Sequence, residues 1–132
     1  MTDIANSRGL AVVPLLALTS TDARVALGCA RAGGFIYCVS VLGVTGARAA
    51  VSGRVSGLVE KVRQHSRLPV GVGFGISKPE HVAEAAQFAD GAVVGSALID
   101  VIGRGTEDGA AERAGKFIKS LVPGTRKAAV PK

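Results

Sequence analysis

Three glycine-bearing segments are the residues best suited to chemistry. They read SVLGVTGAR, GFGIS and VGSA, and each follows a run rich in Val, Ile and Leu. A phosphate needs several N–H donors, and glycine lets the backbone approach it because no Cβ stands in the way; a helix N-terminus adds a favourable dipole. One glycine turn can serve geometry alone, but three in succession favour an anion site. We therefore expect a small phosphate ester at Gly46, Gly75, Gly95 and Ser96, with the Ser96 hydroxyl as an additional donor.

Four apolar runs separated by helical patterns must position these turns. The runs cover residues 12–18, 35–42, 69–74 and 91–95. Helical patterns follow them: one capped within 19–22 and ending near residue 32, one from residue 52 to 66, one from Ser77 with Pro79 in its first turn, a short one from Ser96, and one over 107–122. Continuous apolar runs are typical of parallel strands that are buried on both faces.

The repeat of strand and helix predicts an α/β fold with four parallel β-α units. Each unit spans about 30 residues, which is the spacing of the eight units in a TIM (β/α)₈ barrel. Four such units make half a barrel. A small doubly wound sheet is the alternative, but its glycine-rich turn usually follows the first strand. The first turn here, LALTSTD, has no glycine.

The composition is that of one ordinary domain. We expect a single half-barrel domain over residues 1–132, with flexible ends at 1–11 and 123–132. Cys29 and Cys38 lack metal-site or disulfide spacing, so we expect two buried, reduced thiols. The charge of +6 forms no basic stripe with aromatic residues, and no apolar run reaches membrane-spanning length. We therefore predict no nucleic-acid partner, no membrane partner and an intracellular location.

Three segments, GFIYCVSVLGVTGAR, PVGVGFGISKPEHV and ADGAVVGSALI, closely resemble motifs of the tryptophan synthase α subunit and of its plant relatives, the indole-3-glycerol phosphate lyases. The resemblance covers residues 11–121 and implies that the four strands are the fifth to eighth of that barrel, its C-terminal half. It implies a cytoplasmic protein, or a plastid protein if the source is a plant and a targeting segment lies upstream. It implies that the substrate phosphate is held by Gly46, Gly75, Gly95 and Ser96.

The resemblance also implies roles for four neighbouring residues. Gly73 and Phe74 would shape the turn beneath the phosphate, and Tyr37 would line the indole pocket. Thr45 matches a threonine of a mobile loop that helps to position a catalytic aspartate. By themselves, Tyr37 can equally be an ordinary barrel residue and Thr45 a turn former.

The catalytic groups of the family have no counterpart that we can identify. Cleavage of indole-3-glycerol phosphate to indole and glyceraldehyde 3-phosphate needs acid and base groups. The relatives place a glutamate and an aspartate on early barrel strands, which precede anything in this sequence. Asp22 is better explained as a helix-start residue, Asp90 lies before its strand, and His65 and His81 lie on helices. We assign no catalytic residue, metal or cofactor, and we predict that the chain alone is inactive.

The half barrel should also associate with another chain, because cutting a closed sheet exposes two edges and an apolar interior. We expect self-association, pairing with the missing barrel half, or contact with a tryptophan synthase β subunit. Two other hypotheses stay open. One is a noncatalytic half barrel that binds phosphate esters or a partner, and the other is a decayed gene fragment.

Overall fold

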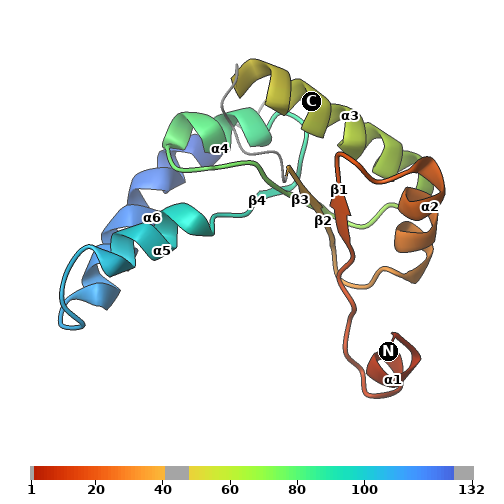
Figure 1. Cartoon of the computed structure of the whole chain (residues 1–132), viewed down its shortest axis with the longest axis horizontal. Coiled ribbons are helices and arrows are strands. Elements are labelled where there is room, and N and C mark those ends of the chain that lie inside the picture. The colour runs from red at the N-terminus through yellow and green to blue at the C-terminus, as the bar shows by residue number, and fades with distance from the viewer. Residues whose placement is uncertain (1, 41–47, 127–132) are drawn as a thin grey trace.

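Four short parallel strands form one sheet in the computed structural model, which describes residues 2–40 and 48–126 (Figure 1). Along the sheet the strands follow chain order: β1 (Leu15–Ala17), β2 (Ile36–Val39), β3 (Val70–Gly73) and β4 (Gly91–Ala92). All three neighbouring pairs are parallel. The predicted order of parallel β-α units is therefore confirmed, although each strand is shorter than its apolar run.

The described ranges also contain six helices, which precede, connect or follow the strands. They are α1 (Thr2–Ser7), α2 (Asp22–Arg31), α3 (Arg48–His65), α4 (Pro79–Ala85), α5 (Ser96–Gly103) and α6 (Ala110–Arg126). Figure 1 shows α2, α3 and α4 on one side of the sheet, α1 apart from them near the start of the chain, and α5 and α6 as a hairpin that projects beyond the β4 end. Within the described ranges, no helix has the length and apolar character needed to cross a membrane.

The side of the sheet that faces the helices contains the core. Leu16, Ile36, Cys38, Val70 and Val72 are buried there against apolar residues of the helices. Successive strand residues point to opposite faces, so the residues between them face the open side. Leu15 is one of these, and 63% of its surface is exposed. The helix face is packed as in a complete domain, whereas the other face is not.

Two helix starts show how the sequence sets local structure. The Thr21 hydroxyl accepts a hydrogen bond from the Arg24 N–H at 3.3 Å and caps α2. Pro79 occupies the first turn of α4, where its missing N–H costs nothing, and the Ser77 N–H donates to Nδ1 of His81 at 3.1 Å. Both starts agree with the predicted positions to within two residues.

The final helix differs from its predicted range of 107–122. It begins at Ala110 and continues through Pro123 to Arg126, because Leu121 and Gly124 are buried against α4 in its last turns. Similarly, α3 begins at Arg48 rather than at residue 52. Residues 2–7 form α1 within the range that we expected to be flexible, but flexibility itself stays a prediction for both ends.

The loop between α5 and α6 is held by one guanidinium group. Arg113 donates from Nε to the Val101 carbonyl at 3.2 Å and from Nη2 to the carbonyls of Ile102 and Thr106, both at 2.8 Å. Nη1 reaches the Asp108 carbonyl at 3.4 Å. Two of these acceptors lie in the last turn of α5, where carbonyls lack helical partners and favour a cation. Arg113 therefore joins the end of α5 to the start of α6.

Asp90 closes the opposite, N-terminal end of the sheet. Its Oδ2 accepts from the Val70 N–H at 2.9 Å and from Nη2 of Arg63 at 3.2 Å, and Arg63 also donates to the Phe88 carbonyl. These contacts tie α3 and β3 to the segment that enters β4. The prediction that Asp90 lies at the end away from the glycine turns is confirmed.

Both cysteines are free and buried, as the sequence predicted. Burial raises the pKa of the Cys29 thiol. Cys38 lies in the sheet, where burial is the main cause that raises its pKa to about 11; Cys29 raises it further and Arg63 opposes the shift. Raised pKa values keep both thiols neutral and unreactive near neutral pH.

Candidate phosphate-binding site

The glycine turns of β3 and β4 lie side by side at the C-terminal ends of the strands. Val72 is the register partner of Ala92, and the Val93 N–H donates to the Val72 carbonyl at 2.8 Å. GFGIS therefore leaves β3 beside the point where VGSA leaves β4. This confirms that the two segments share one end of the sheet.

Gly75 stands at the sharp point of the β3 turn. Its φ is +75°, a left-handed conformation that an L residue with a Cβ adopts only with strain. The preceding residue anchors the turn from behind: Phe74 is buried, and its ring stacks on Phe88 with centroids 6.3 Å apart. The Phe74 side chain thus packs into the core, and it can shape the turn but does not face the open side.

Gly95 and Ser96 form the N-terminus of α5. Gly95 is the N-cap, and its carbonyl accepts from the N–H groups of Leu98 and Ile99 at 3.0 and 3.1 Å. Among the residues that the structure describes, no side chain caps this helix, and both Gly95 and Ser96 are exposed. First-turn N–H groups of a helix have no intrahelical acceptors, so this end presents donors and a positive dipole to solvent.

Tyr37 and Gly73 are in contact across the open face of the sheet. A Cβ built on Gly73 would lie 2.7 Å from the Tyr37 hydroxyl oxygen and 3.2 Å from a ring carbon. The ring therefore crosses the Cα of Gly73 and forms a wall beside the glycine turns. Phe35 covers Gly71 in the same way, with a ring carbon 3.5 Å from the corresponding built Cβ.

Ser40 is a polar residue that sequence reasoning missed. Its N–H donates to the Gly73 carbonyl at 3.0 Å, which places it beside the start of the GFGIS turn. Its hydroxyl oxygen is buried and has no hydrogen-bond partner in the described part of the chain. A buried hydroxyl without a hydrogen bond is unfavourable, so the Ser40 hydroxyl is suited to form a hydrogen bond with a ligand or with the segment that follows Ser40. Its position after an apolar strand was the only signal in the sequence.

Two predicted residues, Thr45 and Gly46, lie outside the described residues, as does the rest of segment 41–47. The other predicted residues at the turns are described: Gly73 ends β3, Gly75 lies in the turn after it, and Gly95 and Ser96 start α5 after β4. Tyr37 lies on the open face of β2. The structure therefore brings together the described members of the predicted phosphate site.

The carboxylates and histidines considered from the sequence lie on or beside helices, and several have structural partners. Asp22, in the first turn of α2, pairs with Lys61 at 2.9 Å. His81 accepts a backbone N–H at the start of α4, and His65 is the last residue of α3. In the ranges 2–40 and 48–126, no group of three or more His, Cys, Asp or Glu side chains could hold a metal ion.

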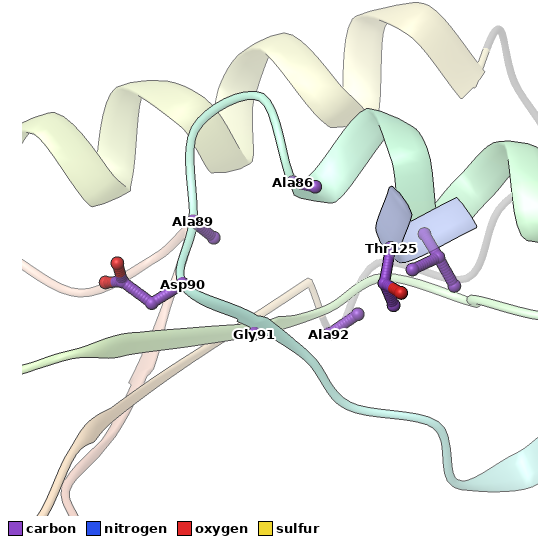
Figure 2. Close-up of a pocket in the computed structure, with 7 residues that line it drawn as sticks. Ala86, Ala89, Asp90, Gly91, Ala92 and Thr125 are labelled. Carbon is purple, nitrogen blue, oxygen red and sulfur yellow. The ribbon is translucent and has the colours of Figure 1, made fainter. Parts of the chain in front are cut away.

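A small hollow lies at the other end of β4 (Figure 2). Its volume is about 160 Å³, and Figure 2 shows Ala86, Ala89, Ala92 and Thr125 around it, while the Asp90 carboxylate points away. The lining is mostly methyl groups, and Asp90 is already bonded to Val70 and Arg63. This hollow offers little to a phosphate.

Residues 1–128 match the family model for the tryptophan synthase alpha chain. Curated tryptophan synthase alpha chains are similar to this chain: that of Chloroflexus aurantiacus is 44% identical over 119 residues, covering 90% of this chain and 45% of that protein. The Caulobacter vibrioides protein is 47% identical over 102 residues, covering 77% of this chain and 37% of that protein.

Solved structures agree in fold. Ligand-free tryptophan synthase from Mycobacterium tuberculosis superposes with a TM-score of 0.77 at 30% identity, covering 95% of this chain and 44% of that one. The tryptophan synthase α2β2 complex of Pyrococcus furiosus gives a TM-score of 0.79 at 35% identity, covering 92% of this chain and 49% of that one. This chain therefore has the fold of the C-terminal half of a TIM barrel, and it spans about half the length of its relatives.

Proposed function

The chain belongs to the tryptophan synthase alpha chain family, and on this premise we propose that its glycine turns bind the phosphate of indole-3-glycerol phosphate. The observation that carries the proposal is the uncapped N-terminus of α5 beside the left-handed turn at Gly75. Backbone N–H groups of Gly75, Gly95 and Ser96 would donate to the phosphate oxygens, and the dipole of α5 would favour the anion. Gly46 would add a fourth donor from segment 41–47.

The indole end of the substrate would lie along the open face of the sheet. Tyr37 would form the wall of that pocket, because its ring already crosses Gly73. The Ser40 hydroxyl, which has no partner among the described residues, lies close enough to the same turn to donate or accept there. Thr45 would support the loop that closes over the substrate.

Turnover requires acid and base groups that these residues do not supply. The lyase reaction must protonate the indole ring and remove a proton elsewhere. Asp22 pairs with Lys61, and Asp90 binds the Val70 N–H and Arg63 at the end of the sheet away from the glycine turns. We therefore propose that this chain contributes phosphate binding to the reaction and that the acid and base come from early barrel strands. A tryptophan synthase β subunit is a further proposed partner, since one solved relative is an α2β2 complex.

Titration with indolepropanol phosphate, followed by amide NMR, tests the binding proposal. We expect shifts at Gly75, Gly95 and Ser96, and we expect Ser96→Ala to weaken binding several-fold because one hydroxyl donor is lost. Gly115→Ala is the matched control, because Gly115 is exposed on α6 and a Cβ there meets nothing within 4 Å. Absence of shifts at all three amides would refute the proposal.

An assay of indole release separates the enzyme hypothesis from the noncatalytic one. We expect no indole from this chain alone and indole once a segment carrying the early strands is supplied. Phosphate binding without indole in both mixtures would favour the noncatalytic phosphate-binding half barrel. Indole from the chain alone would contradict our account of the acid and base groups.

A further inference from the structure

The sheet has two unpaired edges. In the described ranges β1 pairs only with β2, and β4 pairs only with β3. The outer backbone N–H and C=O groups of β1 and β4 therefore lack strand partners, and such edges readily take a further strand. The two edges belong to different strands, so β4 of one chain could pair with β1 of another. We call such a β4–β1 contact between two chains a seam.

Apolar hollows run beside both edges. At β1 the hollow has a volume of about 340 Å³, and its lining includes Val12, Leu15 and Leu27. At β4 the volume is about 310 Å³, and the lining includes Val94 and Val122 with other apolar residues of α4 and α6. Leu15 is 63% exposed and Val122 is 40% exposed, so each edge offers apolar side chains to a neighbour.

The exposed area is larger than a monomer of this size should have. The chain exposes 8603 Å² for a mass of 13.3 kDa, whereas a compact monomer of that mass exposes about 6,500 Å². The excess is about 2,100 Å² per chain, or about 4,200 Å² for two chains, which falls within the range of roughly 2,000–5,000 Å² that obligate homodimers bury. A second copy can therefore account for the excess area.

We propose that two copies of this chain associate so that β4 of each lies parallel to β1 of the other. A two-fold axis along the barrel axis keeps all the strands parallel and makes the two seams equivalent. Two sheets of four strands then close into the eight-stranded barrel architecture, which leaves no edge unpaired. A second copy carries both complementary edges and covers Leu15 and the open face at the same time. It occupies the edges that a segment with the early strands would need, so that segment must displace the second copy before the lyase reaction of the proposed function can proceed.

Sedimentation of the full 132-residue chain between about 1 and 200 µM tests the proposal through its concentration dependence. We expect a species of twice 13.3 kDa. Leu15→Lys at the β1 edge and Val122→Glu at the β4 edge should each weaken the dimer roughly tenfold or more, because a charge would be buried in both seams. Ile99→Lys is the matched control, since Ile99 is 69% exposed and lines neither hollow.

Mixing the Leu15→Lys and Val122→Glu chains gives the sharpest result. A mixed pair has both charges in one seam and an intact second seam, so mixing should restore dimer that neither variant forms alone. The proposal is wrong if the chain stays monomeric at the highest concentration or forms a different oligomer. It is also wrong if Ile99→Lys weakens the dimer equally, or if the mixture forms no more dimer than either variant alone. Circular dichroism checks the fold of each variant, and Leu27→Lys with Ile118→Glu repeats the test at the same edges if either chain unfolds.

Discussion

Gly124 is the position where adding one methyl group should be most damaging. It is buried in the last turns of α6, where that helix crosses the start of α4. A Cβ built on it would overlap the Pro79 carbonyl oxygen and would lie 2.8 Å from the Val82 Cβ. The carbonyl belongs to the backbone, so it cannot rotate away. We therefore expect Gly124→Ala to push α6 away from α4.

The magnitude follows from these distances. Carbon atoms pack about 3.5–4.0 Å apart, so the helices must separate by about 1 Å to admit the methyl group. Overpacking of this kind costs about 1–3 kcal/mol, and an immovable carbonyl places this site near the upper end of that range. Alanine regains up to about 1 kcal/mol of helix propensity. The expected net loss in the free energy of unfolding is about 2 kcal/mol.

Urea denaturation of Gly124→Ala and Gly115→Ala provides the assay. A loss of about 2 kcal/mol lowers the urea midpoint by about 1 M at a typical slope. Gly115 lies in the same helix, but a Cβ there meets nothing within 4 Å, so Gly115→Ala should be neutral or stabilising by up to about 1 kcal/mol. If Gly124→Ala is as stable as Gly115→Ala, α6 does not approach α4 closely and the reasoning is refuted.

Three further predictions concern Arg113, Asp90 and Cys38. Arg113→Ala removes the donors to four carbonyls, so we expect a loss of about 1–2 kcal/mol and faster amide exchange over residues 103–109; unchanged exchange would contradict this. Asp90→Ala should cost about 1–2 kcal/mol in urea, because the Val70 N–H loses its side-chain acceptor, while Asp90→Asn should recover part of the loss. The pKa of Cys38 is raised to about 11, so burial favours the neutral thiol: stability from this group is complete below the unfolded pKa near about 8.5 and falls as pH rises toward 11. In Cys38→Val the free energy of unfolding should therefore fall less between pH 8 and pH 11 than it does in the unsubstituted protein. Equal slopes of the free energy of unfolding against pH in the two proteins would refute this account.

The strands and their order were predictable because their cause is local. Val70 and Val72 alternate with glycine and lie in a run without charged residues, which favours a buried parallel strand. Pro79 and Thr21 mark helix starts through their own backbone and side-chain chemistry. The described residues of the proposed phosphate site lie at strand ends for the same reason, since each turn follows directly from its strand.

Features that depend on distant contacts were not predictable from the sequence. Pro123 normally indicates the end of a helix, yet α6 continues through it, because Gly124 packs on α4 more than 40 residues earlier in the chain. The direction of the Phe74 ring depends on Phe88, and the four acceptors of Arg113 are brought together by the α5–α6 turn. Ser40 stands out only once the packing shows that its hydroxyl is buried.

The two glycines of β3 leave the open face of the sheet to side chains from the neighbouring strand. Gly71 and Gly73 place no side chain on the open face, and rings from Phe35 and Tyr37 lie over them. The depth of any cavity on this face is therefore set by residues in and just before β2, while a Cβ at Gly73 would collide with the Tyr37 hydroxyl. Altered ligand preference, whether evolved or engineered, should arise through substitutions at Phe35 and Tyr37, with Gly73 kept constant.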